Sequence, residues 1–205
     1  MKFTLAFQII AALIAGAAEN PSSSLIEVES GAVVFLAATN MPGIEVKGKS
    51  GALAAHVEIS RDGSGLLLQQ IEATVPVKTL GTGMKLRDEH MRKYIFTTAE
   101  GQEPDLRFTA EATVCGSKGS TREFACDLSG LLTLRGIPRP AGFGLHIKED
   151  GSGTFRAVGD GVVSLTTYGI TPPSQFGVKP SDQVKVHLEF TGKLKPAVAS
   201  AGGSR

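Results

Sequence analysis

This chain of 205 residues has almost no surplus of charge of either sign, and this absence is the most informative one. Lys and Arg total 21 against 20 Asp and Glu, so the formal net charge is +1. A nucleic-acid binder normally carries a concentrated basic footprint. The balance therefore predicts no nucleic-acid partner, and no block of like charge marks a docking site for an acidic membrane surface.

Signatures of catalysis are also absent. The sequence has no Gly-x-Ser-x-Gly elbow, no phosphate-binding glycine loop with Lys and no HExxH. The four histidines have no partner at metal-ligand spacing, and they are interpreted as surface residues: His56, His90, His146 and His187. We expect no enzyme activity, no metal and no cofactor. An active site assembled from distant residues is the alternative.

Cysteine is scarce, with Cys115 and Cys126 as the whole complement. An oxidising compartment would favour a disulfide between them. Strand alternation is against it, because Cys115 has outward parity in the run that contains Leu106, whereas Cys126 shares the parity of inward-facing Phe124. A bridge would need a bulge or an irregular loop between the two strands. The pairing stays open at this point.

Long apolar runs are missing apart from the N-terminus, where residues 1–17 have a short Lys2 n-region, an apolar stretch and small residues at Ala15 to Ala17. This pattern predicts a secretory signal peptide cleaved after Ala17, hence a periplasmic or secreted protein that is not integral to the membrane after cleavage. An uncleaved anchor or a buried strand is the alternative. Residues 18–24 are predicted to be a linker and 196–205 a disordered tail.

The remaining sequence is dominated by apolar residues at every second position, the repeat of a half-buried strand. Such runs begin at Leu25 and at Val33 and recur to the end of the chain. The clearest examples are Leu53 to Ser60, Ile71 to Val77, Leu106 to Val114, Phe124 to Arg135, Phe143 to Ile147, Phe155 to Leu165 and Val184 to Thr191. Turn signals separate them at Asn40 to Gly43, Asp62 to Gly65 and Asp150 to Gly153, a corner is expected over residues 136–140, and Gly159 and Gly161 suggest a bend.

One segment has a different pattern. Residues 80–96 contain two glycines followed by a charged run of helix formers, which predicts a short helical insert between strands. About eight strands with no βαβ rhythm indicate an all-β, antiparallel sandwich or barrel, and a barrel of about eight strands can hold one small ligand. We expect a single domain over residues 25–195.

Several short motifs, taken in order, resemble the YceI-like family. They are the run from Thr82 to Met91, Phe108 in its strand, the run from Gly130 to Ile137, and Tyr168-Gly169-Ile170 before a final strand. The resemblance implies an extended lipocalin-like antiparallel barrel with an apolar channel that holds a polyisoprenoid or similar amphiphile, commonly in the bacterial periplasm. Many members carry an Arg and an acidic residue just before the aromatic-Gly-Ile segment, where this chain has Leu165-Thr166-Thr167. No role of those charges can be carried over.

The inward-facing apolar side chains are the candidate ligand site. They are Phe35, Leu53, Val57, Ile71, Phe108, Leu132, Phe143, Leu145, Phe155 and Leu188. Alternatively these side chains simply pack together, as in a solid β-sandwich that serves as an envelope interaction or stress module. With the resemblance, we expect a channel for an isoprenoid, fatty acid or related amphiphile, bound without catalysis.

The helical insert is the candidate mouth of this channel, where cations could pair with a phosphate or carboxylate headgroup. The residues considered are Lys85, Arg87, Arg92, Lys93 and Tyr94. The alternative is a solvated helix with pairs of Asp88 with Arg92 and Glu89 with Lys93. A homodimer is compatible with the sequence but has no specific signal.

Overall fold

The computed structural model describes residues 24–63, 65–119, 122–174 and 177–196. The predicted signal peptide at 1–17 and residues 197–205 of the predicted tail lie outside these ranges, as does the predicted linker except Ser24. Ser24 is the first residue of a strand and the last strand ends at Pro196, so the described strands include one residue on either side of the predicted 25–195 range.

The described part of the chain contains ten strands and four short helical segments. The strands are β1 (Ser24–Thr39), β2 (Glu45–Ser50), β3 (Ala54–Asp62), β4 (Gly65–Val75), β5 (Leu106–Ala110), β6 (Thr113–Ser117), β7 (Glu123–Leu134), β8 (Ile137–Glu149), β9 (Thr154–Ser164) and β10 (Pro180–Pro196). The helical segments are η1 (Val77–Thr79), α1 (Lys85–Met91), the π-helical turn η2 (Arg92–Phe96) and η3 (Thr166–Tyr168). The helical insert predicted over residues 80–96 is therefore present.

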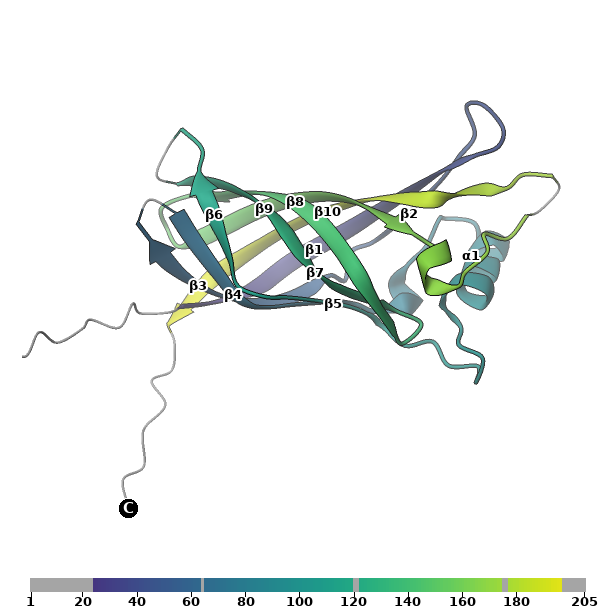
Figure 1. The fold of residues 1–205 in the computed structure, drawn as a ribbon, viewed down its shortest axis with the longest axis horizontal. Helices are drawn as coiled ribbons and strands as arrows, with labels where there is room; N and C mark the ends of the chain where they lie inside the picture. The colour runs from purple at the N-terminus through teal and green to yellow at the C-terminus, as the bar shows by residue number, and fades with distance from the viewer. Residues whose placement is uncertain (1–23, 64, 120–121, 175–176, 197–205) are drawn as a thin grey trace, which may run out of the picture.

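The sheet closes on itself. Its strands are ordered β10-β9-β8-β7-β5-β4-β3-β1, and β1 pairs again with β10, always antiparallel. Because β5 and β6 share one position between β4 and β7, the wall is an eight-stranded barrel, elongated in Figure 1. The predicted all-β lipocalin-like barrel is confirmed, and the sandwich alternative is wrong because the first and last strands are hydrogen-bonded along their length.

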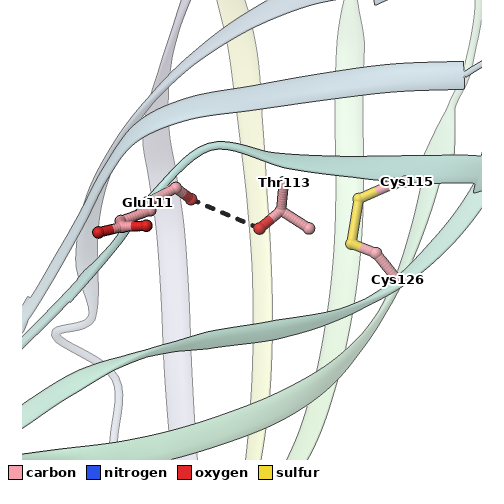
Figure 2. The surroundings of a disulfide bond; sticks show 4 residues. All are labelled: Glu111, Thr113, Cys115 and Cys126. Carbon is pink, nitrogen blue, oxygen red and sulfur yellow. Dashed lines mark hydrogen bonds between the residues drawn. A yellow bond between two sulfur atoms is a disulfide. The ribbon is translucent and has the colours of Figure 1, made fainter.

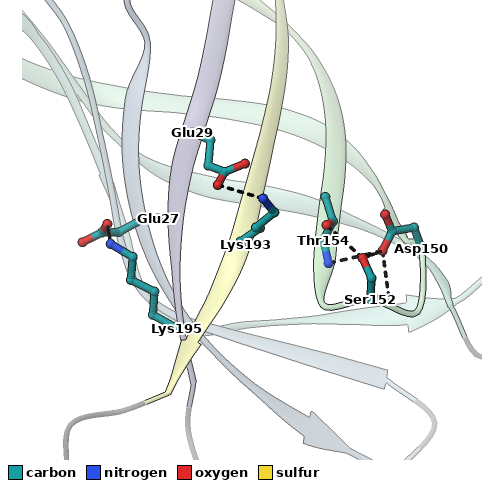
Figure 3. Close-up of polar contacts among 7 residues, drawn as sticks. All are labelled: Glu27, Glu29, Asp150, Ser152, Thr154, Lys193 and Lys195. Carbon is teal, nitrogen blue, oxygen red and sulfur yellow. Dashed lines mark hydrogen bonds and ion pairs between the residues drawn. The ribbon is translucent and has the colours of Figure 1, made fainter.

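Ion pairs lie across the seam where β1 meets β10 (Figure 3). Lys193 Nζ lies 3.2 Å from Glu29 Oε1, and Lys195 pairs with Glu27 in the same way. The hydrogen bond and charge of Lys195 lower the pKa of Glu27 below its ordinary value. These contacts join opposite charges on directly neighbouring strands, an arrangement that favours the observed register.

The predicted strand from Leu106 to Val114 is wrong in its second half. The chain leaves the ladder at Glu111 and Ala112, and the Thr113 hydroxyl donates to the Glu111 carbonyl at 3.4 Å, as Figure 2 shows. This interruption reverses the alternation, so that Val114 is 50% exposed and Cys115 is fully buried. The irregularity required for a disulfide is thus present.

Cys115 on β6 and Cys126 on β7 are disulfide-bonded, with their Cα atoms 4.5 Å apart (Figure 2). The outward orientation expected for Cys115 was wrong, because it counted parity through the break at Glu111 and Ala112. The bond ties the short strand β6 to the barrel wall.

Three local expectations also change. The two runs from Leu25 and Val33 are one strand, β1, with a register shift between Val28 and Ser30. The corner at 136–140 is a two-residue turn at Arg135 and Gly136, both with positive φ, so Ile137 already pairs with Leu134. The bend suggested at Gly159 and Gly161 does not involve a β-bulge, because β9 keeps its register with both neighbouring strands through these glycines.

Buried apolar side chains form two clusters along the barrel. The first includes Leu66, Cys115 and Phe124, near the turns that join β3 to β4 and β8 to β9. The second includes Leu80, Met91 and Ile170, beside α1. Figure 1 places the β6 region and α1 at opposite ends, so the barrel has two chemically distinguishable ends.

Candidate ligand-binding cavity

A cavity of about 1140 Å³ occupies the barrel interior. Its wall includes members of both buried clusters, so it extends from one to the other. All ten side chains singled out as channel residues line it: Phe35, Leu53, Val57, Ile71, Phe108, Leu132, Phe143, Leu145, Phe155 and Leu188. The interior is therefore hollow, unlike a core in which these side chains pack against one another.

The cavity ends below the disulfide. Phe124 and Cys115 are 1% and 0% exposed and lie in the first cluster, but neither lines the cavity. The guanidinium of Arg61 lies 5.0 Å from the centre of the Phe124 ring. We call this packed region, defined by Cys115, Cys126 and Phe124, the closed end.

The opposite end is open. Every lining residue that is exposed to solvent lies near α1, in the β1–β2 turn or in the segment before β10: Ile44, Glu45, Met84, Leu86, Tyr94, Thr171, Ser174 and Lys179. Figure 1 shows the β1–β2 hairpin and α1 at this same end, away from the described termini. We call the opening bordered by these residues the mouth.

Polar groups in the lining are confined to the mouth. Apart from the Tyr94 phenol, the lining residues with polar side chains are Glu45, Thr82, Arg87, His90, Thr171, Ser174, Lys179 and Ser181. The remaining lining side chains are hydrocarbon or thioether. The cavity is thus an apolar tube with a polar opening, a shape suited to a molecule with an apolar tail and a polar head.

Arg87 is the best positioned cation of the mouth. Its Nε donates to Thr82 Oγ1 at 2.8 Å, and its Nη2 donates to the Thr82 carbonyl at 3.1 Å. The Thr82 backbone N–H and hydroxyl in turn donate to Asp88 Oδ1 at 2.7 and 2.5 Å. Burial opposes ionisation of Asp88, but the Thr82 hydrogen bonds and the charges of Arg92 and Arg87 lower its pKa below the ordinary value. This network fixes the guanidinium at the opening.

The five predicted mouth residues divide by helix face. Arg87 and Tyr94 line the cavity together with His90 and Met91, the spacing of one face of a helix. Lys85, Arg92 and Lys93 are on other faces and do not line the cavity, so their contact with a headgroup stays a prediction. The alternative pairs of Asp88 with Arg92 and Glu89 with Lys93 are not among the ion pairs of the described residues.

Lys179 is a mouth cation that the sequence did not indicate. The side chain of Asn40, at the end of β1, holds its segment in place: Asn40 Oδ1 accepts from the Lys179 backbone N–H at 2.7 Å, and Asn40 Nδ2 donates to the Gly177 carbonyl at 3.0 Å. The Asn40 backbone N–H also donates to the Lys179 carbonyl at 3.0 Å. Because these residues are far apart in the chain, no local pattern could reveal the contact.

Glycines in the wall explain how the lumen stays open despite its phenylalanines. A Cβ atom on Gly161 would lie 2.6 Å from the Phe143 ring, one on Gly130 would lie 2.7 Å from Phe108, and one on Gly48 would lie 2.1 Å from Phe35. The rings therefore rest on bare backbone of a neighbouring strand. Gly159 accommodates Leu145 in the same way. We call these four residues the wall glycines.

The segment from Leu165 to Ile170 contributes to the wall. Leu165 lines the cavity, and Tyr168 is 3% exposed with its hydroxyl donating to the Leu132 carbonyl at 3.0 Å. Burial raises the pKa of Tyr168. This hydrogen bond secures η3 against the barrel.

Two other site types find no support in the described ranges. They contain no group of three or more His, Cys, Asp or Glu residues arranged to hold a metal ion. Nor do they contain a helix with the length and apolar character needed to span a bilayer.

Residues 23–192 match the model of the YceI-like domain. The chain belongs to the YceI-like family. The motifs from Thr82 to Met91, from Gly130 to Ile137 and at Tyr168 lie within this match, so the resemblance inferred from them is confirmed.

Solved structures of the same fold are distant in sequence. A polyisoprenoid binding domain from Saccharophagus degradans, implicated in plant cell wall breakdown, has 14% identity and a TM-score of 0.59, covering 86% of this chain and 100% of its own. The YceI protein of Campylobacter jejuni has 17% identity and a TM-score of 0.57, covering 76% and 89%.

BcnA of Burkholderia cenocepacia has 11% identity and a TM-score of 0.57, covering 78% of this chain and 95% of its own. No curated protein sequence matches the chain. At these identities the structural likeness establishes the fold alone.

Proposed function

We propose that this YceI-like protein binds and carries an amphiphile with a long apolar chain, a polyisoprenoid or fatty-acid-like lipid, without transforming it. The observation that carries the proposal is the distribution of polarity in the cavity: a hydrocarbon lining inside and polar groups at the mouth. One structural neighbour is a polyisoprenoid binding domain, which favours the same ligand class.

The interior supplies the affinity in this proposal. Burying a methylene group contributes about 0.8 kcal/mol. A dozen buried carbons would contribute about 10 kcal/mol, which lies within the range of about 4–15 kcal/mol that association costs, so the net affinity would grow with the length of the buried chain. An elongated cavity closed below the disulfide would accept the tail end of the lipid first.

The mouth supplies the orientation. Arg87 is fixed beside Thr82, and Lys179 lines the same opening, so two cations border the place where a lipid headgroup would sit. Cationic side chains form strong, charge-assisted hydrogen bonds with carboxylate and phosphate. We therefore propose an anionic headgroup, with Arg87 and Lys179 as its contacts and Tyr94 beside them. Lys85, Arg92 and Lys93 are not assigned this role.

The proposed setting is the periplasm or the extracellular space. The disulfide between Cys115 and Cys126 supports an oxidising compartment. The N-terminal signal pattern agrees with it, although residues 1–17 lie outside the described ranges. A carrier of this kind would shield a water-insoluble chain between membranes or enzymes, and no catalysis is part of the proposal.

A matched pair of substitutions tests the proposal. Val186 lines the cavity on β10, whereas Val162 is 53% exposed on the outer wall of the adjacent β9. We expect Val186→Trp to reduce the affinity of delipidated protein for a fluorescent fatty acid and for a polyprenyl phosphate by tenfold or more, and Val162→Trp to leave it unchanged. Equal affinities for all three proteins would contradict binding inside the barrel.

A further inference from the structure

The exposed apolar side chains of this protein are unevenly distributed. Nine large apolar residues are exposed in the described part of the chain, and five lie at the mouth end: Met41, Ile44, Met84, Leu86 and Tyr94. Four of these five also line the cavity. The fifth, Met41, lies in the same turn as Ile44, whose backbone N–H donates to the Met41 carbonyl at 3.1 Å. The opening is therefore bordered by apolar groups that face water.

Basic residues accompany this apolar border on the surface outside the cavity. Lys85 and Lys93 are exposed on the helical segment beside Leu86 and Tyr94, with Lys93 Nζ 5.3 Å from the centre of the Tyr94 ring. Lys47 and Lys49 are exposed on β2, the strand that follows Ile44. We call Met41, Ile44, Met84, Leu86, Tyr94, Lys47, Lys49, Lys85 and Lys93 the rim.

The four rim lysines are in no ion pair of the described residues, as is also true of Arg156 and Lys185 on the wall. The seven ion pairs of the described residues all lie along the barrel wall or at the closed end, such as Arg107 with Glu72. The part of the surface that exposes the most bulky apolar groups thus also has cations without a carboxylate partner.

From this combination we infer that the rim docks on the surface of an anionic lipid bilayer, with the mouth facing the membrane. Apolar side chains at the acyl boundary and Lys beside them at the headgroups are the features of an interfacial membrane contact. The inference deepens the proposed function and rests on it, because a docked mouth would let the lipid pass between bilayer and cavity without crossing water. A protein partner would be expected to supply carboxylates for the lysines, whereas anionic phospholipids supply the same charge at high density.

Flotation of purified protein with lipid vesicles tests the inference. One set contains 30% phosphatidylglycerol in phosphatidylcholine, and the other contains phosphatidylcholine alone. We expect binding to the anionic set that weakens with salt. Lys85→Gln combined with Lys93→Gln should reduce it about 30-fold, since each basic residue near such a surface contributes about fivefold. Met41→Asp, made as a separate variant, should also reduce binding to the anionic vesicles.

The matched controls lie on the wall. Arg156→Gln combined with Lys185→Gln removes the same charge from the exposed surfaces of β9 and β10, and Val158→Asp adds an acid where Val158 is 39% exposed. We expect both to bind anionic vesicles much more tightly than the corresponding rim variants. Equal losses in rim and wall variants would overturn the inference, because attraction would then follow net charge.

A vesicle-free titration with a dispersed fatty acid separates this inference from the proposed function. Lys85, Lys93 and Met41 do not line the cavity, so their variants should take up the ligand as the parent does. If the parent takes up the ligand but binds no vesicles, docking alone would be overturned. The same holds if the parent binds no vesicles but forms a dimer that Met41→Asp disrupts, because the rim would then be a contact between two copies of the protein. Vesicle binding without uptake of any ligand would overturn the carrier function and leave docking in place.

Discussion

The two ends of the barrel use apolar side chains in opposite ways. At the closed end Phe124 and Cys115 are excluded from water and from the cavity, and a disulfide joins the strands beside them. At the mouth Leu86 and Met84 are 56% and 58% exposed while also lining the cavity. The closed end is thus packed and cross-linked, whereas the mouth leaves bulky apolar side chains in contact with water.

The largest expected difference between the ends is in packing energy. Phe124→Ala should lower the free energy of unfolding by about 3–5 kcal/mol, because it creates a new void in a packed region. Phe190→Ala should cost less than half as much, since the half-buried Phe190 ring already borders the cavity. Urea unfolding of the two variants measures both values. Equal losses would show that the interior is packed alike along its length.

Removal of the disulfide is the next largest effect. Cys115 and Cys126 are 11 residues apart, and closing such a loop stabilises a fold by about 3 kcal/mol. The double variant Cys115→Ala/Cys126→Ala should lose about this much in urea unfolding and keep the lipid affinity of the parent, because neither residue lines the cavity. A large loss of affinity at a temperature where the variant is folded would contradict the separation of the two ends.

The wall glycines provide a sharper test of the hollow interior. A Cβ on Gly159 would lie 2.7 Å from Leu145 Cδ2, so Gly159→Ala should push Leu145 into the lumen and weaken lipid binding about tenfold. The control is Gly142→Ala on β8, where the nearest atom would be the Leu128 carbonyl oxygen at 3.6 Å. Isothermal titration of both variants with the lipid measures the two affinities. Similar affinities would show that the bound lipid does not occupy the space above Gly159.

The smallest effect is expected on the outer wall, at His187. Its Nδ1 lies 2.7 Å from Asp160 and its Nε2 lies 3.1 Å from Glu189, and the hydrogen bonds to Asp160 and then Glu189 raise the pKa of His187. A raised pKa stabilises the fold below the unfolded value of about 6.5, and this contribution is lost as pH rises through the folded value.

His187→Gln should remove this pH dependence. Exposed ion pairs contribute about 0.2–1 kcal/mol, so the parent should melt a few degrees higher than the variant at pH 5 and at nearly the same temperature at pH 8. Thermal melts across this range check the sign. A difference that grows with pH would contradict the assigned interactions.

Much of the fold could be predicted because it depends on local alternation. The period-two pattern identified Phe143, Leu145 and Ile147 as inward residues, and the turn chemistry located the hairpin at Asp62 to Gly65. Alternation fails where the chain leaves the ladder. The break at Glu111 and Ala112 reversed the expected orientation of Val114 and Cys115, and nothing in those two residue types signals a break.

The site was less predictable than the fold because its mouth is assembled from distant segments. Helix periodicity could have separated Arg87 from Lys85 and Lys93, since Arg87 shares a face with His90 and Tyr94. The wall glycines could also have been noticed, because Gly159 and Gly161 are at inward positions of a strand. Lys179 could not, because only the Asn40 contact places its segment at the opening.

Native mass spectrometry of the protein purified without detergent shows whether the barrel holds a lipid. We expect a mass increment from a bound amphiphile that disappears after organic extraction, returns on incubation with a polyprenyl phosphate or long-chain fatty acid, and is diminished in Val186→Trp. A protein that carries no lipid when isolated, and that takes up neither compound after extraction, would contradict a cavity built for a guest.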